Sequence, residues 1–164
     1  MKQFITIIKL CLLLGTSPAL AQDYAISFET LDSLQKQSPK PVVVFLHADW
    51  CKFCANMKNT TFQNEEVKAL LSDQFYFVSF DGESKEDVKL LGNTFRYKPT
   101  GANTGVHELA EQLGTKDGTL SYPTVTFLNA KYEILYQHDS FISGKKLKKT
   151  LSRLLKSVDT SRSN

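Results

Sequence analysis

The sequence has little cysteine and lacks the signatures of several large protein classes. It holds three cysteines in 164 residues, and its N-terminal apolar stretch, Leu10 to Leu14, is too short to span a bilayer. It contains no glycine-rich phosphate-binding loop, no nucleophile elbow, no internal repeat and no low-complexity segment. Nucleotide and carbohydrate enzymology therefore have no supporting motif. What remains, with 41% hydrophobic and 23% charged residues, is the composition and length of one globular domain.

The N-terminus has the order of a secretory signal peptide. Lys2 and Lys9 are basic, the short apolar stretch follows them, and Ala19-Leu20-Ala21 forms an A-x-A cleavage site. We expect residues 1–21 to be removed as a signal peptide and the mature protein to begin at Gln22. A buried N-terminal helix is the alternative interpretation.

Removal of this segment changes the charge and the cysteine count. The formal net charge falls from +3 to +1, because Lys2 and Lys9 leave and no acidic residue does. This balance gives no electrostatic support for a nucleic-acid partner. Cys11 also leaves, so both remaining cysteines lie in one C-x-x-C motif, Cys51 and Cys54. We expect an exported protein, periplasmic or secreted, without stable membrane insertion, in a compartment where disulfides persist.

Hydrophobic periodicity predicts one α/β domain over residues 22–158. Continuous apolar runs indicate buried strands, and apolar residues at helical spacing indicate amphipathic helices. The expected elements are, in order, a helix at 26–37, a strand at 42–46, a helix at 53–71 broken near 59–61, a strand at 75–80, a helix at 106–113, strands at 124–128 and 132–137, and a helix from 143. A strand–helix–strand unit favours a parallel pair, so we predict a small mixed sheet with helices on both faces.

Residues 82–105 exceed what this architecture needs and form an expected insertion before the third core strand. Gly92-Asn93 fits a hairpin turn, because both residue types tolerate positive φ. The stretch from Pro99 to Gly105 indicates irregular chain after it. The insertion is either a site of partner recognition or a passive surface loop. Residues 159–164 are expected to form a frayed tail.

The two cysteines fall where a buried strand ends and a helix begins. The first turn of a helix presents unpaired N–H groups and a partial positive charge, which stabilise a thiolate at Cys51. Cys54 lies on the same side of that turn, and Lys52 adds a positive charge. C-x-x-C sites lower a thiol pKa from about 8.5 to roughly 3.5–7.5. Redox activity is therefore the leading interpretation of the motif.

Two other interpretations of the cysteine pair are a zinc site and a structural disulfide. A structural zinc site needs further ligands, and the mature chain offers the scattered His47, His107 and His138. A disulfide this local closes too small a loop to stabilise the fold much. We expect no metal and no cofactor.

The residues around the motif carry a family resemblance. The segment Val44 to Cys54, followed by Thr61-Phe62 and Glu65-Glu66-Val67, resembles the active-site region of the thioredoxin superfamily. It is most similar to exported thioredoxin-like domains, including the C-terminal domain of DsbD. Tyr122-Pro123-Thr124 resembles the cis-proline loop of the same superfamily. The resemblance covers roughly residues 39–155 and implies a thioredoxin-like fold.

The resemblance also implies roles for individual residues. Cys51 would be the exposed attacking thiol and Cys54 the buried resolving thiol. Pro123 would be cis and packed against this pair, and the backbone of Tyr122 would pair with a substrate strand. Trp50 would shield the edge of the site or serve packing alone.

The sequence departs from the family pattern at two positions. Family members usually have a buried acid in the strand before the motif and a lysine on the next strand, and here these positions are Phe45 and Phe77. A buried carboxylate would accept the proton of the resolving thiol, so its absence leaves the proton acceptor for Cys54 unassigned. This absence also puts rapid reductase turnover in doubt. His47 is a candidate for tuning the site together with Lys52, or else a packed or edge-strand histidine.

Together these features predict a thiol–disulfide oxidoreductase. It would exchange its Cys51–Cys54 dithiol or disulfide with protein substrates outside the cytoplasm, and the resemblance to DsbD favours reduction. Its partners would be protein thiols or disulfides and a separate redox partner that supplies electrons. The alternative is a non-catalytic thioredoxin-fold binding module whose thiols hold a partner or a soft metal such as Cu(I).

Overall fold

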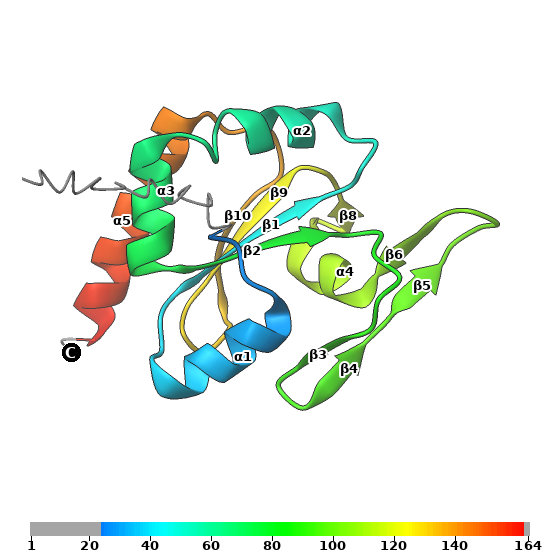
Figure 1. Cartoon of the computed structure of the whole chain (residues 1–164), viewed down its shortest axis with the longest axis horizontal. Coiled ribbons are helices and arrows are strands. Elements are labelled where there is room, and N and C mark those ends of the chain that lie inside the picture. Colours follow the sequence, from blue (N-terminus) through cyan, green and yellow to red (C-terminus); the bar gives the residue numbers. More distant parts are fainter. Residues whose placement is uncertain (1–23, 163–164) are drawn as a thin grey trace, which may run out of the picture.

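The computed structural model describes residues 24–162, so the expected signal peptide, its cleavage point and Cys11 lie outside the described part of the chain (Figure 1). A four-stranded sheet forms the centre, in the order β10-β9-β1-β2. Its strands are β1 (Val42–His47), β2 (Tyr76–Asp81), β9 (Thr124–Leu128) and β10 (Ile134–His138). Strand β2 runs parallel to β1, whereas β9 is antiparallel to β1 and β10 is antiparallel to β9. This arrangement confirms the small mixed sheet predicted from the sequence.

Helices cover both faces of the sheet (Figure 1). One face carries α1 (Phe28–Gln37) and α4 (Glu108–Gly114), and the other carries α2 (Lys52–Asn59), α3 (Glu65–Gln74) and α5 (Gly144–Arg162). The fully buried strand β1 lies between the two layers, and its alternate side chains enter opposite cores. Val43 and Phe45 pack with α2, α3 and α5, and the intervening residues pack with α1 and α4. A strand covered on both faces must be apolar throughout, which explains its continuous hydrophobic run.

The first helix starts two residues later than predicted. Ser27 caps α1 by accepting a hydrogen bond from the Thr30 N–H at 3.2 Å. The chain before this cap pairs with β2 instead of continuing the helix. The Ile26 N–H donates to the Phe77 carbonyl at 2.8 Å, beside a bridge between Ala25 and Phe77. The segment expected to begin a helix therefore lies along the outer edge of β2.

The ends of α2, α3 and α5 can also be compared with the bounds predicted from the sequence. The predicted break near residues 59–61 is confirmed, because α2 ends at Asn59 and Asn64 caps α3 with a bond from the Val67 N–H at 3.1 Å. The last helix starts at Gly144, close to the expected residue 143. It continues to Arg162, so the expected domain end at residue 158 and frayed tail from 159 fall inside α5.

The insertion consists of two hairpins. The first joins β3 (Val88–Leu90) to β4 (Asn93–Phe95), and its turn residues with positive φ are Leu91 and Gly92. The predicted hairpin is thus present, with its turn one residue earlier than Gly92-Asn93. The second hairpin joins β5 (Tyr97–Pro99) to β6 (Gly105–His107) and projects from the body of the molecule (Figure 1). The prediction of irregular chain from Pro99 to Gly105 was therefore wrong at both ends of this stretch.

The region after the insertion also differs from prediction. Helix α4 begins at Glu108, not at residue 106, because Val106 and His107 belong to β6. A further hairpin, β7 (Thr115–Lys116) and β8 (Thr119–Leu120), was not predicted. Its turn residues Asp117 and Gly118 both have positive φ, and Asp-Gly is a strong signal for such a two-residue turn. The sequence therefore contained the information for this hairpin.

Candidate active site

The turn between β1 and α2 holds Cys51 and Cys54 in a disulfide. The S–S distance is 2.03 Å and the Cα atoms lie 5.2 Å apart. The Cys51 N–H donates to the Ala48 carbonyl at 3.0 Å, which folds the turn back onto the end of β1. Cys51 is the N-cap of α2, and its sulfur accepts a hydrogen bond from the Cys54 N–H at 3.1 Å. The first turn of α2 therefore directs a donor at this sulfur, which stabilises negative charge there after reduction.

Both cysteines are buried in the oxidised protein. Cys51 is 5% exposed and Cys54 is 1% exposed, within the core cluster that also contains Ala48 and Met57. The order of exposure agrees with the expected roles, but the expectation of an exposed attacking thiol was wrong for this state. The cause is the packing of both side chains against the core below α2. A partner would reach Cys51 from the rim of the site.

The loop before β9 forms one part of this rim. The peptide bond between Tyr122 and Pro123 is cis, as the resemblance implies. Pro123 is buried immediately before β9, and the side chain of Tyr122 packs against the cluster that contains both cysteines. β9 pairs with β1, the strand that leads into the cysteine motif, so the sheet brings together segments that lie far apart in the sequence.

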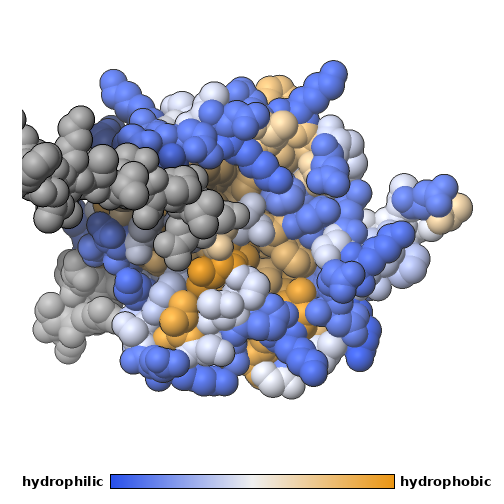
Figure 2. Space-filling view, in the orientation of Figure 1, coloured by the Kyte–Doolittle hydropathy of each residue, from blue (hydrophilic) through white to orange (hydrophobic). Residues whose placement is uncertain are grey.

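Two large apolar side chains form another part of the rim. Trp50 is 66% exposed and Phe53 is 65% exposed, on either side of the first cysteine. The Trp50 ring stands edge-on to the Tyr122 ring, with centroids 6.0 Å apart. Figure 2 shows apolar surface among hydrophilic side chains over the region of α2. Trp50 thus borders the site with most of its surface exposed, which suits contact with a partner more than packing alone.

The base of the insertion contacts this rim, which the sequence did not indicate. The Trp50 indole N–H donates to the Glu83 carboxylate at 2.9 Å. At Gly82 an added Cβ would lie 2.0 Å from the Tyr122 hydroxyl oxygen, so this position is restricted to glycine while the Tyr122 ring stays in place. The Gly82 N–H donates to the His47 carbonyl at 2.8 Å, which fixes the insertion to the end of β1. These contacts join residues more than 30 positions apart in the sequence, so no local sequence pattern could predict them.

The Tyr122 hydroxyl is buried and finds no hydrogen-bond partner among the described residues. Burial raises the pKa of Tyr122 to about 12, and the nearby Glu83 and Asp81 carboxylates act in the same direction. The hydroxyl is therefore protonated at every physiological pH. It acts through its shape and position, not through proton transfer.

His47 lies at the end of the central strand, packed and not at a sheet edge. It is 7% exposed, and its Nδ1 lies 3.3 Å from the Lys58 ammonium. Burial, and to a lesser extent the Lys58 cation, lower the pKa of His47 to about 4, against the opposing effects of Asp81 and Asp49. The ring is therefore neutral at pH 7. Lys52, the other candidate for tuning, is exposed in the first turn of α2.

The histidines do not gather into a metal site in the described part of the chain. Within residues 24–162, no group of three or more His, Cys, Asp or Glu side chains is placed to hold a metal ion. His107 uses both ring nitrogens: Nδ1 accepts from the Leu109 N–H at 3.2 Å, and Nε2 lies 3.2 Å from the Glu86 carbonyl. This pairing assigns the proton to Nε2. The role of His107 is to cap α4 and anchor the insertion.

Comparison with known proteins identifies the family. Residues 29–130, more than half of the chain, match a family model described as thioredoxin-like. The chain belongs to this thioredoxin-like family. Among curated proteins, human spermatogenesis-associated protein 20 is 36% identical over 67 residues, which are 41% of this chain and 8% of that protein. The thioredoxin-like chain thus corresponds to a small part of that relative.

Solved structures show the same fold at low sequence identity. A thioredoxin from Thermus thermophilus has a TM-score of 0.57 at 18% identity, covering 80% of this chain and 86% of that one. A DsbH oxidoreductase has a TM-score of 0.53 at 19% identity, covering 82% and 83%. The oxidised C-terminal domain of DsbD from Neisseria meningitidis has a TM-score of 0.50 at 20% identity, covering 76% and 90%. The predicted thioredoxin-like fold is confirmed.

Aromatic packing fills the positions where thioredoxin-like proteins usually have the acid and the lysine. The centroids of the Phe45 and Phe62 rings lie 4.6 Å apart, and those of the Phe62 and Phe77 rings lie 5.0 Å apart. Beside them is a groove of about 240 Å³, also lined by Lys58 and Ser79. No carboxylate is present among the described residues that line this groove. The thioredoxin-like fold therefore packs its cysteine pair in one core cluster with these aromatic rings, and the lining of the groove offers no carboxylate to accept the proton of Cys54.

Proposed function

We propose that this thioredoxin-like protein is an exported thiol–disulfide oxidoreductase that acts on protein substrates through Cys51 and Cys54, and that it works as a reductase. The observation that carries the proposal is the cysteine pair itself. A disulfide at the start of α2, with the Cys54 N–H directed at the Cys51 sulfur, is an arrangement that can open to a stabilised thiolate and close again.

The reaction follows from the two positions of the sulfurs. In the reduced protein, the Cys51 thiolate attacks one sulfur of a substrate disulfide, and the other substrate sulfur leaves as a thiolate. The Cys54 thiolate then attacks the Cys51 sulfur of the mixed disulfide, which releases the second substrate thiol and forms the Cys51–Cys54 bond. Two electrons pass from the dithiol to the substrate. A separate dithiol donor must reduce the protein again.

The rim of the site supports a polypeptide as the substrate. Trp50 and Phe53 expose apolar surface next to the buried disulfide, and the cis-proline loop offers the backbone of Tyr122 beside it. Pro123 has no N–H, so a substrate strand would pair with the residue before it. An extended segment with an apolar residue next to its cysteine fits this surface.

Export is supported by the N-terminal pattern and by the use of cysteine. With residues 1–21 removed, both remaining cysteines belong to the redox pair. In the described residues 24–162, no helix combines the length and apolar character needed to cross a bilayer. We propose that the mature protein begins at Gln22. N-terminal sequencing of the exported product should begin at Gln22, and a product that retains Met1 would contradict this proposal.

Reduction of insulin with dithiothreitol as the electron source tests the enzyme activity. We expect the protein to accelerate insulin reduction, and both Cys51→Ser and Cys54→Ser to fall to the background rate. Cys54→Ser should trap a mixed disulfide through Cys51, whereas Cys51→Ser should trap none. Unchanged rates in both variants would contradict the proposal. Stoichiometric binding of Cu(I) without insulin reduction would instead support a thiol-based binding module.

The direction of electron flow is tested by the reduction potential of the Cys51–Cys54 pair. Equilibration with glutathione or dithiothreitol buffers gives this value. A potential near about −270 mV, as in thioredoxin, supports the reductase, and a value near about −120 mV would make the protein an oxidant.

A further inference from the structure

Positive charge is concentrated on α5, the C-terminal helix. Residues 144–162 contain seven Lys or Arg and one acidic residue, Asp159, a net charge of +6. Residues 24–143 contain 11 Lys or Arg and 15 Asp or Glu, a net charge of −4. The molecule therefore carries a basic helix on an acidic body, a separation that the small overall charge conceals.

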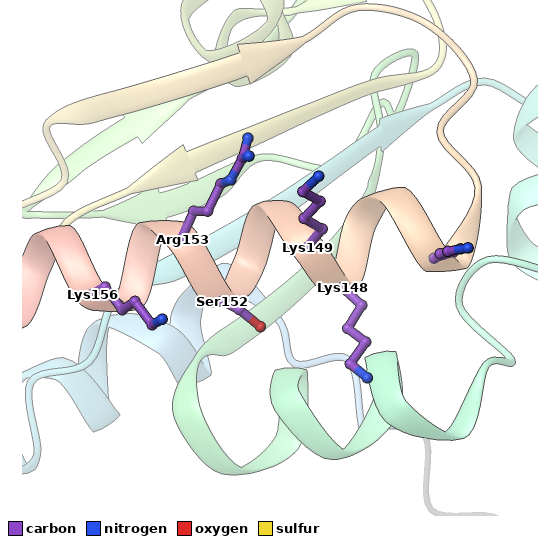
Figure 3. Close-up of a pocket in the computed structure, with 6 residues that line it drawn as sticks. Lys148, Lys149, Ser152, Arg153 and Lys156 are labelled. Carbon is purple, nitrogen blue, oxygen red and sulfur yellow. The ribbon is translucent and has the colours of Figure 1, made fainter.

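The cations of α5 line an open groove of about 430 Å³. Figure 3 shows Lys149 and Arg153 projecting to one side of the helix, and Lys148, Ser152 and Lys156 to the other. Together with Lys145, they cover the outer face of the helix over about 16 Å. Apart from this one serine, every residue that lines the groove is basic.

The opposite side of α5 is already occupied by the core. Leu147 and Leu151 are fully buried, and α5 packs against α3. Packing of these leucines holds the helix in place, so the fold does not need the lysines on its outer face. The basic face is left turned outward.

The position of these cations opposes the stability of the helix. The first turn of a helix carries a partial positive charge, and α1, α3 and α4 have acids there, whereas α5 has no acid and begins with Lys145. Lys145, Lys149 and Arg153 also repeat four residues apart, at which spacing like charges repel. Lys148 pairs with Glu66, but these three have no ion pair within residues 24–162. These charges therefore lower the stability of the helix, and folding does not explain their presence.

We propose that the outer face of α5 binds the surface of a bilayer that contains anionic phospholipids. A row of cations along one helix complements a flat layer of phosphate headgroups, and clusters of four to eight Lys or Arg suit such surfaces. The residues that line the groove include no aromatic side chain to stack on nucleic-acid bases and no apolar anchor for a protein interface. Anionic headgroups are the ligand that this lining fits best.

Binding through α5 would leave the redox site accessible. Helix α2 begins on the side of the molecule away from α5, so a bilayer that contacts α5 does not cover the cysteine pair (Figure 1). The protein would act on substrates near a membrane surface without inserting into it. This inference does not depend on the redox activity, because it rests on a different helix and a different kind of contact.

Vesicle co-sedimentation of the full chain tests the proposal. The vesicles contain phosphatidylcholine alone or a mixture of phosphatidylcholine and phosphatidylglycerol. The variant Lys149→Glu/Arg153→Glu reverses two charges of the basic face of α5. The control Lys89→Glu/Lys131→Glu reverses two exposed lysines elsewhere, with the same change in net charge. All proteins share one N-terminus, so a contribution of residues 1–23 cancels in the comparison. Far-UV circular dichroism and urea unfolding show that all three proteins are folded, whether or not they reduce insulin.

We expect the parent chain to bind the anionic vesicles and to dissociate at high salt. The α5 variant should bind them at least tenfold more weakly, and the control variant within about threefold of the parent. Equal binding to both vesicle types, an equal loss in the control variant, or tighter binding to single-stranded DNA would overturn the proposal. Displacement by millimolar inorganic phosphate would also overturn it, by assigning the groove to a small anion.

Discussion

The Trp50 indole reaches across the rim of the disulfide to a carboxylate of the insertion. This bond to Glu83 at 2.9 Å, with the edge-on contact to Tyr122, holds an exposed aromatic ring in one place. Because Trp50 is largely exposed, the bond competes with water and contributes modestly to stability. We expect its main effect to be on the orientation of the ring that, under the proposed function, contacts a substrate. Glu83 is therefore a positioning residue for Trp50.

We expect Glu83→Ala to raise the KM for a protein disulfide about three- to fivefold, with a smaller change in kcat. This corresponds to the loss of one hydrogen bond worth about 1 kcal/mol. Glu83→Gln should keep the parent KM, because its amide oxygen also accepts from the indole. Insulin reduction kinetics measure both variants, and fluorescence of Trp50, the single tryptophan of the sequence, reports the environment of the ring.

A double-mutant cycle with Trp50→Phe isolates this contact. Phenylalanine keeps an aromatic ring but removes the indole N–H, so Glu83→Ala should have no further effect on KM in that background. An equal effect of Glu83→Ala with and without the indole would show that Glu83 acts in another way.

His47 makes the stability of the protein depend on pH. Its pKa is about 4 in the folded protein and about 6.5 in an unfolded chain, so between these values the unfolded state binds a proton that the folded state excludes. Stability therefore rises with pH through this window and falls as the pH drops from about 6.5 toward 4. Linkage gives a loss of up to about 2 kcal/mol at pH 5 from this residue.

Urea unfolding at pH 7 and pH 5 measures this contribution. The loss of stability between the two pH values should be smaller in His47→Gln than in the parent, because glutamine does not titrate. His138→Gln, at the end of β10, serves as the control and should lose stability as the parent does. The same pH dependence in His47→Gln and the parent would contradict the assignment to His47.

At the scale of elements, the tip and the base of the β5–β6 hairpin differ in how much they contribute to the stability of the fold. The tip of the β5–β6 hairpin, residues 100–104, is exposed and closes on itself through the Thr100 N–H and the Thr104 carbonyl at 2.8 Å. The base is anchored by His107, which is fully buried, packs edge-on to Phe80 and donates its backbone N–H to Gly82. The hairpin is thus fixed at one end and free at the other, as suits partner recognition.

We expect His107→Ala to destabilise the protein by about 2–4 kcal/mol, because it removes a buried ring and leaves two backbone groups unpaired. Replacement of residues 100–104 by Asn-Gly should change stability by less than about 1 kcal/mol, since a two-residue turn can close the strands. Thermal or urea unfolding of the two variants gives the comparison. A hairpin deletion as damaging as His107→Ala would show that the tip supports the fold.

Helix α5 carries a conflict between folding and the proposed membrane contact. Lys149 lies four residues from both Lys145 and Arg153, the spacing at which like charges on a helix repel each other. We expect Lys149→Glu to raise the free energy of unfolding by about 0.5–1 kcal/mol, because it replaces two repulsions by attractions. Urea unfolding at low salt measures the gain. Lys89→Glu, outside the helix, should show no such gain, and a loss of stability in Lys149→Glu would contradict this account.

At the scale of the whole molecule, the fold brings three separate segments to one end of the sheet. The cysteine motif follows β1, the cis-proline loop precedes β9, and Gly82-Glu83 follows β2. Strand β2 runs parallel to its neighbour β1 and β9 runs antiparallel to it, so the end of β2 and the start of β9 both lie beside the end of β1, where α2 follows. Helix α2, whose first turn carries the disulfide, starts at this end, and α5 lies along another flank of the molecule (Figure 1).

The elements that the sequence predicted well are those whose pattern is local. The continuous apolar run of β1 reflects burial on both faces of the strand, and the leucine spacing of α5 reflects burial of one face of the helix. The segment Cys51 to Cys54 is recognisable as a short motif. The boundaries near Ile26 and Val106 were misplaced, because pairing with β2 and within the insertion overrode helical periodicity.

From the sequence came the cysteine pair, as a short motif, and a mixed α/β sheet, as local hydrophobic patterns. The resemblance carried by short motifs implied the thioredoxin-like fold and the cis-proline segment. Tertiary structure alone decided the burial of Cys51, the bond between Trp50 and Glu83, and the fit of Tyr122 over Gly82. These depend on strand order and on packing between segments more than 30 residues apart, where a change of one ångström decides whether two side chains touch.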